Sequence, residues 1–117
     1  MQIRKFEIDG KEVEFVNTSR DTRNGFAHDT TFFINGCQYG EATCHYINRT
    51  WERYAFQTVM RQAVHIEMEK RIDWVRNKFK LDKGYTKITA KRQPEFEEAI
   101  NADEKVGFYR KLLKALE

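Results

Sequence analysis

Hydrophobic and polar residues alternate along two stretches near the start of the chain, and each stretch contains a dipeptide typical of tight turns. Asp9-Gly10 and Asn35-Gly36 suit the two left-handed positions of a type I′ hairpin turn. Around the first turn, the expected pairing sets Phe6 opposite Val13, with apolar side chains on one face and charged ones on the other. The pattern therefore predicts two antiparallel β-hairpins.

The segment between the hairpins, residues 17–25, is polar, and we expect it to form a loop. In the second hairpin, a regular register places Phe32 and Tyr39 on one face and Phe33 and Ala42 on the other. Both faces are partly apolar. This indicates a central ribbon that a helix covers on at least one side.

From about Ala55 the apolar period lengthens to three and four residues, which is typical of a helix. The resulting stripe predicts one long amphipathic helix that ends near Leu81. Pro94 suits the first turn of a short helix over residues 95–101, and Asp103 can cap a final helix. We therefore predict an α+β fold in which two antiparallel β-hairpins form a four-stranded sheet, followed by one long helix and two shorter C-terminal helices. The chain is expected to be a single domain over residues 1–117, β-rich over 1–54 and helical over 55–117.

The composition supports folding, because the 117 residues are 40% apolar and 14% aromatic and include one proline. The first residues contain no apolar run, so we expect no signal peptide and no membrane span. A cytoplasmic protein with two reduced cysteines is the resulting expectation.

The net charge of +3 is unevenly distributed. Residues 76–92 contain seven basic side chains and one acidic one, Asp82. The next block contains five acidic and no basic side chains, namely Glu95, Glu97, Glu98, Asp103 and Glu104. We favour the interpretation that the two blocks are solvated helix faces that neutralise each other. The alternative is that the basic block is a binding patch and the acidic block competes with its ligand.

The chain contains no recognisable catalytic motif, so we expect that the protein is not an enzyme and that it binds no cofactor. Cys37 and Cys44 point to opposite faces unless a bulge intervenes, which makes them poor joint zinc ligands. His28 and His45 fall diagonally on one face of the second hairpin in the expected register. They are candidate metal ligands, with a third from Glu41, Glu52 or His65, against the favoured alternative of surface or hydrogen-bonded histidines.

The connection between the last strand and the long helix, residues 48–54, is dense in polar and aromatic side chains. We interpret it as a corner that fixes the sheet on the helix, with Trp51 and Tyr54 in the core. The alternative is a binding hot spot.

Nucleic-acid binding is a further possibility, because arginines and aromatic residues can contact phosphates and bases. The candidate phosphate contacts are Arg20, Arg23, Arg49, Arg53 and the basic run of residues 76–92. Phe26, Trp51 and Tyr54 are available as stacking surfaces. The low net charge argues against a dedicated nucleic-acid binder.

The run from Tyr46 to Met60, YINRTWERYAFQTVM, resembles a group of small proteins carried by phages, prophages and plasmids of Gram-positive bacteria. The upstream run from Thr22 to His28, TRNGFAH, is similar to the same group, so the resemblance covers residues 22–63. It implies a mobile-element accessory protein in a bacterial cytoplasm that binds and blocks a host defence machine. An anti-CRISPR protein whose partner is a Cas nuclease is one such inhibitor, and the acidic block could occupy the basic nucleic-acid channel of that partner.

Overall fold

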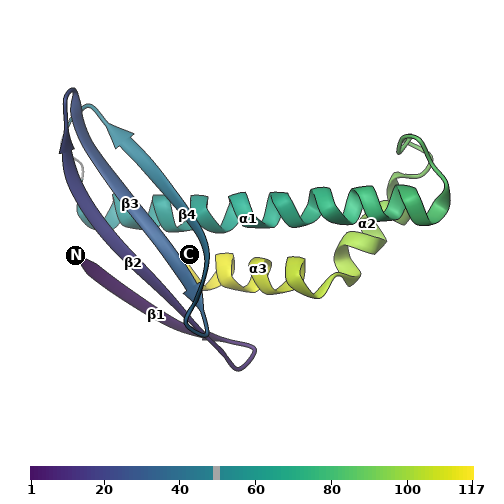
Figure 1. Ribbon diagram of the computed structural model, residues 1–117, viewed down its shortest axis with the longest axis horizontal. Helices are drawn as coiled ribbons and strands as arrows, with labels where there is room; N and C mark the ends of the chain where they lie inside the picture. The colour runs from purple at the N-terminus through teal and green to yellow at the C-terminus, as the bar shows by residue number, and fades with distance from the viewer. Residues whose placement is uncertain (49–50) are drawn as a thin grey trace.

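The computed structural model describes residues 1–48 and 51–117, which form one antiparallel sheet followed by three helices. The elements are β1 (Gln2–Ile8), β2 (Lys11–Thr22), β3 (Gly25–Ile34), β4 (Cys37–Tyr46), α1 (Glu52–Lys83), α2 (Gln93–Ala102) and α3 (Glu104–Ala115). The strands lie in the order β1-β2-β3-β4, so each is hydrogen-bonded to its neighbour in sequence (Figure 1). The predicted α+β class and element order are confirmed.

Both predicted hairpin turns are present. Asp9 and Asn35 have positive φ angles of 52° and 49°, and each is followed by a glycine that is also left-handed. The first register is the expected one, with Phe6 opposite Val13. Because the turn chemistry and the alternation agree, the apolar face of this hairpin is directed at the core.

The expected loop over residues 17–25 is wrong, because β2 continues to Thr22 and β3 begins at Gly25. Polar residues are accommodated here because they bond across the strands. Buried Thr30 donates a hydrogen bond of 2.6 Å to the side-chain oxygen of Asn17, which is also buried. Gly25 is required at the turn, since a Cβ atom there would lie 2.0 Å from the carbonyl oxygen of Tyr46.

A bulge in β4 changes which side chains share a face. Phe33 pairs with Gln38 and Phe32 pairs with Gly40, so Tyr39 has no partner in β3. Beyond the bulge, Cys44 is opposite His28 and faces the helices, whereas His45 lies on the other side of the sheet. The expectation that His28 and His45 share a face is therefore wrong, and Cys37 and Cys44 lie on the same face.

The long helix α1 has 32 residues, which corresponds to about 48 Å of length at 1.5 Å per residue. Only its first part packs on the sheet, and the rest extends beyond it beside α2 and α3 (Figure 1). The main core lies between the sheet, α1 and α3, and contains Phe15, Phe32 and Met60. A second, smaller core lies at the far end of α1, with Phe79 and Phe96 among its members.

The junction between α2 and α3 is fixed by Asp103, as the sequence predicts. Its carboxylate accepts a hydrogen bond from the backbone N–H of Val106 at 3.1 Å and so caps α3. The same carboxylate receives two bonds from the Arg71 guanidinium, of 3.0 and 2.9 Å. Arg71 in turn stacks over the ring of Trp74 at 3.8 Å. Asp103 is therefore a structural residue that ties α3 to α1.

Candidate functional site

The start of α1 exposes large apolar side chains that the fold does not use. Trp51 is 85% exposed, Tyr54 is 64% exposed, and Ile47 at the end of β4 is 83% exposed. We call these three residues, with Arg53, the aromatic end. The expectation that Trp51 and Tyr54 lie in the core is wrong, because the buried stripe of α1 begins at Ala55. Residues three apart share a helix face, and here that face is turned to solvent.

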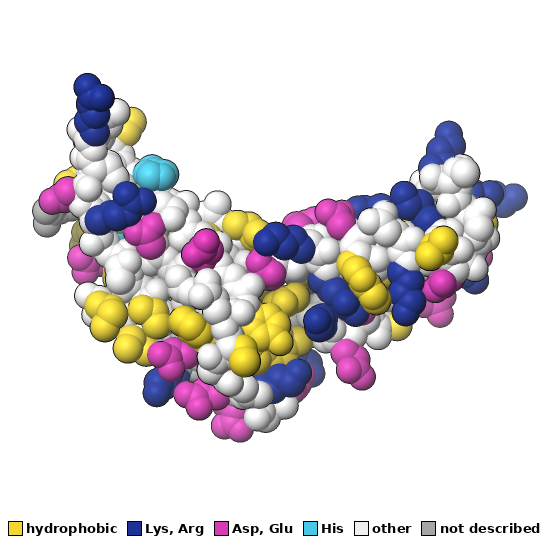
Figure 2. Space-filling view, in the orientation of Figure 1, with side chains coloured by type: hydrophobic (Ala, Val, Ile, Leu, Met, Phe, Trp, Pro, Cys, Tyr) yellow, Lys and Arg dark blue, Asp and Glu magenta, His cyan; other side chains and the backbone are white. Residues whose placement is uncertain are grey.

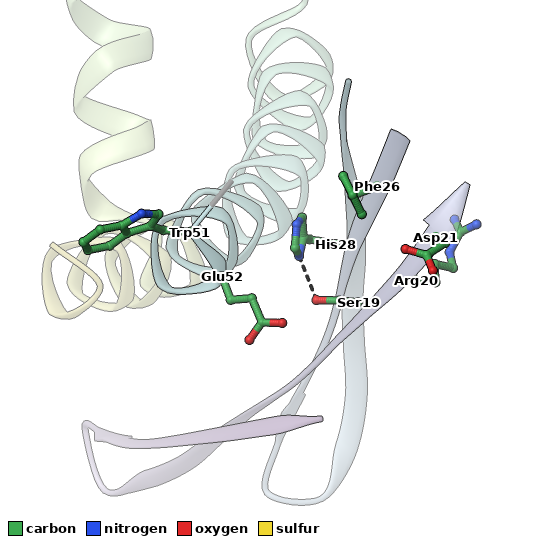
Figure 3. A pocket seen from close by; sticks show the side chains of 7 residues that line it. All are labelled: Ser19, Arg20, Asp21, Phe26, His28, Trp51 and Glu52. Carbon is green, nitrogen blue, oxygen red and sulfur yellow. Dashed lines mark hydrogen bonds between the residues drawn. The ribbon is translucent and has the colours of Figure 1, made fainter. Parts of the chain in front are cut away.

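A hollow of about 700 Å³ lies between the first turn of α1 and the end of the β2–β3 hairpin (Figure 3). Glu52 and Trp51 both line it, and in Figure 3 Glu52 points toward Ser19 whereas the Trp51 ring points away from Ser19. A second hollow of about 730 Å³ shares Ser19 and Glu52 and continues toward Arg4 and Arg53. This end of the molecule is thus concave, with an aromatic ridge beside it.

His28 contributes to the wall of the first hollow and is only 4% exposed. Its Nδ1 lies 2.8 Å from the Ser19 hydroxyl oxygen, and its ring contacts Tyr46 and Phe56 edge-on at 5.6 and 5.5 Å. A nucleophile–base pair needs a further group that orients the imidazole. Among the described residues, no carboxylate hydrogen-bonds to His28. The Ser19–His28 contact therefore closes the edge of the core and gives no support to hydrolytic chemistry.

Arg20 lies on the outer face of the sheet, where its charge is partly neutralised. It forms an ion pair of 3.0 Å with Asp29, which also accepts a hydrogen bond of 2.5 Å from Thr43. Burial tends to raise the pKa of Asp29, but the hydrogen bonds from Thr43 and Arg20 and the positive charge of Arg20 outweigh it. The pKa is lowered as a result. His45 is on this same face, apart from His28, and the described residues contain no cluster of three metal-ligating side chains.

The other predicted contact arginines lie at the same end of the molecule. Arg23 sits in the β2–β3 turn and Arg53 in the first turn of α1, and neither forms an ion pair with a described carboxylate. Arg49 lies outside the described residues. Arg53 thus adjoins Tyr54 in α1, and Arg23 lines a shallow hollow together with Ile47.

Comparison with protein-family models, curated proteins and solved structures gave no match to this chain. The resemblance of residues 22–63 to mobile-element proteins therefore stays a prediction. No helix within residues 1–48 and 51–117 combines the length and apolar character needed to cross a bilayer.

The predicted acidic surface does not form one face. Glu95, Glu97 and Glu98 are exposed on α2, Glu104 begins α3, and Asp103 is held by Arg71. In Figure 2 acidic and basic side chains are interspersed over the end that carries α2. None of the ion pairs among the described residues joins this acidic block to residues 76–92. The two blocks are therefore not neutralised by direct pairing.

Sequence reasoning missed the polar layer inside the sheet. Asn17 is fully buried and its amide nitrogen lies 3.4 Å from the sulfur of Met60. The signal was present, because Asn17 continues the alternation of Val13 and Phe15 toward the core. The polar composition of residues 17–25 favoured a loop. The pairing of β2 with β3 shows why the amide of Asn17 is tolerated in the core.

Proposed function

We propose that this chain is a small binding protein that acts by occupying a surface of a larger protein, and that the aromatic end makes the contact. The observation that carries the proposal is the exposure of Trp51, Tyr54 and Ile47 next to a concave surface. Large apolar side chains cost free energy when left in water, and such groups on a surface mark interaction sites. Tryptophan, tyrosine and arginine are also the residues that dominate binding energy at protein interfaces.

The shape of this end supports a protein partner. The ridge of Trp51 and Tyr54 can enter a pocket of the partner, and the hollow beside Glu52 can receive a side chain from it. Arg23 and Arg53 are unpaired with described carboxylates and can meet acidic groups at the rim. The partner class follows from the sequence resemblance: the effector nuclease of a bacterial CRISPR system, which this chain would inhibit in the bacterial cytoplasm.

We locate the proposed contact at the aromatic end and not on the acidic block. Glu95, Glu97 and Glu98 lie on α2 and Glu104 on α3, and Figure 2 shows basic side chains among the acidic ones at the end of the molecule that carries α2. A mixed surface is a poor competitor for a basic nucleic-acid channel. The aromatic end has exposed apolar area that the acidic block lacks.

The test is inhibition of a purified Cas effector nuclease by the wild-type chain and by a Trp51→Ala/Tyr54→Ala variant. We expect the wild type to bind the effector and slow DNA cleavage, and the variant to bind at least 30-fold more weakly, since hot-spot residues each contribute about 2 kcal/mol or more. Trp74→Ala is the matched control, because Trp74 is also exposed on α1 but lies away from the aromatic end.

Two outcomes would contradict the proposal. Equal affinity of the double variant and the wild type removes the aromatic end as the contact surface. A wild-type chain that leaves every effector tested fully active removes the partner class. In that case, a pull-down from host lysate with the wild type and the double variant would still show whether the aromatic end binds another protein.

A further inference from the structure

The far end of α1 carries a second surface of different chemistry. Lys80 and Lys83 lie in the last turn of α1, and Lys87 and Lys91 lie in the connection to α2. We call these four lysines the basic tip. They lie at the opposite end of the long helix from the aromatic end (Figures 1 and 2). The basic tip and the aromatic end can therefore contact different molecules.

The connection that carries the basic tip is held in place by packing. Gly84 ends α1 in a left-handed conformation, and the N–H of Tyr85 donates a hydrogen bond of 2.8 Å to the carbonyl of Lys80. The Tyr85 ring packs against Phe79 with a centroid distance of 5.9 Å, and the Arg92 guanidinium stacks on the Tyr85 ring at 3.7 Å from its centre. The lysines thus project from a defined backbone.

The charges of the basic tip are not used within the fold. Among the described residues, none of the four lysines forms an ion pair, whereas Arg76 is paired with Asp73. Helix-dipole complementarity accounts for lysines in the last turn of α1. It does not account for Lys87 and Lys91, which lie beyond the helix. Asp82 and the carboxylates of α2 lie at this end too, but none of the described carboxylates forms an ion pair with the four lysines, so these charges stay available to an external polyanion.

The lack of a continuous apolar face at the basic tip points to a phosphate backbone. Of the exposed large apolar side chains in the described part of the chain, Leu81 and Trp74 lie near the four lysines, and the Trp74 ring is covered by Arg71 at 3.8 Å and Lys78 at 5.2 Å. Membrane-bound helices insert a continuous apolar face, and protein interfaces bury aromatic anchors. Contacts to nucleic-acid phosphates need neither, since they are made by lysine and arginine charges alone. We propose that the basic tip binds the phosphate backbone of nucleic acid without sequence preference.

The test is a titration of the full chain into a labelled DNA duplex over a series of salt concentrations. Two variants with the same charge change are compared: Lys87→Gln/Lys91→Gln at the basic tip and Lys105→Gln/Lys114→Gln on α3. Lys105 and Lys114 are exposed and outside the described ion pairs. Each lysine–phosphate contact contributes about 0.9 to the slope of log affinity against log salt, so removing two contacts should flatten the slope by about 2. The affinity at about 50 mM salt should fall roughly tenfold or more.

The same titration with vesicles of anionic lipid, and with a duplex of unrelated sequence, completes the design. The proposal predicts equal binding to both duplexes, weaker binding to vesicles, and a control variant indistinguishable from the wild type. It is overturned if the wild type does not bind DNA at about 50 mM salt. It is also overturned if the α3 control loses as much affinity as the tip variant, or if vesicles bind more tightly than DNA. The Trp51→Ala/Tyr54→Ala variant should keep its DNA affinity, which separates this inference from the proposed protein contact.

Discussion

Replacing Asp103 tests how α3 is tied to α1. Asp103→Asn keeps an N-cap side chain, since asparagine caps as well as aspartate, but it removes the charge that Arg71 binds. The side chains of Arg71 and Asp103 are 23% and 12% exposed, so the pair is partly shielded from water. Hydrogen bonds to charged groups contribute about 1.5–3 kcal/mol, and we expect Asp103→Asn to lower the free energy of unfolding by about 2 kcal/mol. Asp103→Ala also loses the cap and should cost about 1 kcal/mol more.

The pH dependence of the stability difference between the wild type and Asp103→Asn tests whether the charge of Asp103 is the source of that difference. The bonds from Arg71, opposed by burial and helped by the N–H of Val106, hold the pKa of the Asp103 carboxyl below its usual value. A carboxyl whose pKa is lowered on folding adds stability at pH above its unfolded pKa of about 3.9. That stability is lost as the pH falls through the folded pKa. The difference between the wild type and Asp103→Asn should therefore be full near neutral pH and shrink below about pH 4.

Urea denaturation followed by circular dichroism, over a range of pH, measures these differences. Glu97→Gln is the control, because it removes one carboxylate charge from an exposed position on α2 and should change stability by less than about 0.5 kcal/mol. Near neutral pH, the melting temperature of Asp103→Asn should fall by several degrees. A wild-type advantage that stays constant into strong acid would refute the role given to the Arg71–Asp103 pair.

Two further predictions concern glycines and cysteines. Gly107→Ala should raise the free energy of unfolding by about 0.5–1 kcal/mol, because a Cβ atom within α3 would meet nothing within 4 Å. Gly40→Ala should lower the free energy of unfolding by more than about 1 kcal/mol, since the added atom would lie 2.7 Å from the Phe32 ring. Urea denaturation that ranked the two variants the other way would contradict this prediction. Burial raises the pKa of the Cys44 thiol, whereas Cys37 is exposed. In single-thiol variants, Cys44 should react with a disulfide reagent more slowly than Cys37, and a faster reaction would show that Cys44 is accessible.

The parts of the fold that local rules control were predictable from the sequence. The turn dipeptides set the position of two hairpins, the four- and three-residue spacing set α1, and Asp103 marked the start of α3. The third turn was missed because residues 23–24 are not a recognisable hairpin pair and the polar strand before them pairs through buried hydrogen bonds. The bulge at Tyr39 has no local signal in the sequence. Compared with a regular register, it moves every later residue of β4 to the opposite face of the sheet.

The candidate site was harder to predict because it depends on how the elements pack together and not on local sequence. The 48–54 segment was recognised as unusual, but whether its rings are buried depends on the rotation of α1 about its axis. The buried stripe from Ala55 onward fixes that rotation and turns Trp51 and Tyr54 outward. A rule that reads aromatic residues as core therefore fails at the first turn of a helix. The position of the basic residues relative to the acidic block also depends on how α2 packs against α1.

The second core gives the two ends of the molecule separate stabilities. It contains five buried side chains, and Met68 packs against both this core and the main one. Opening the far end exposes only this small cluster, so it requires less free energy than unfolding the sheet. Backbone amides of α2 should then exchange with solvent hydrogen through partial opening, whereas those of β2 and β3 exchange only when the whole domain unfolds. Substitutions such as Phe96→Ala would melt the far end while the sheet and the start of α1 stay folded, so selection can change one surface without losing the other.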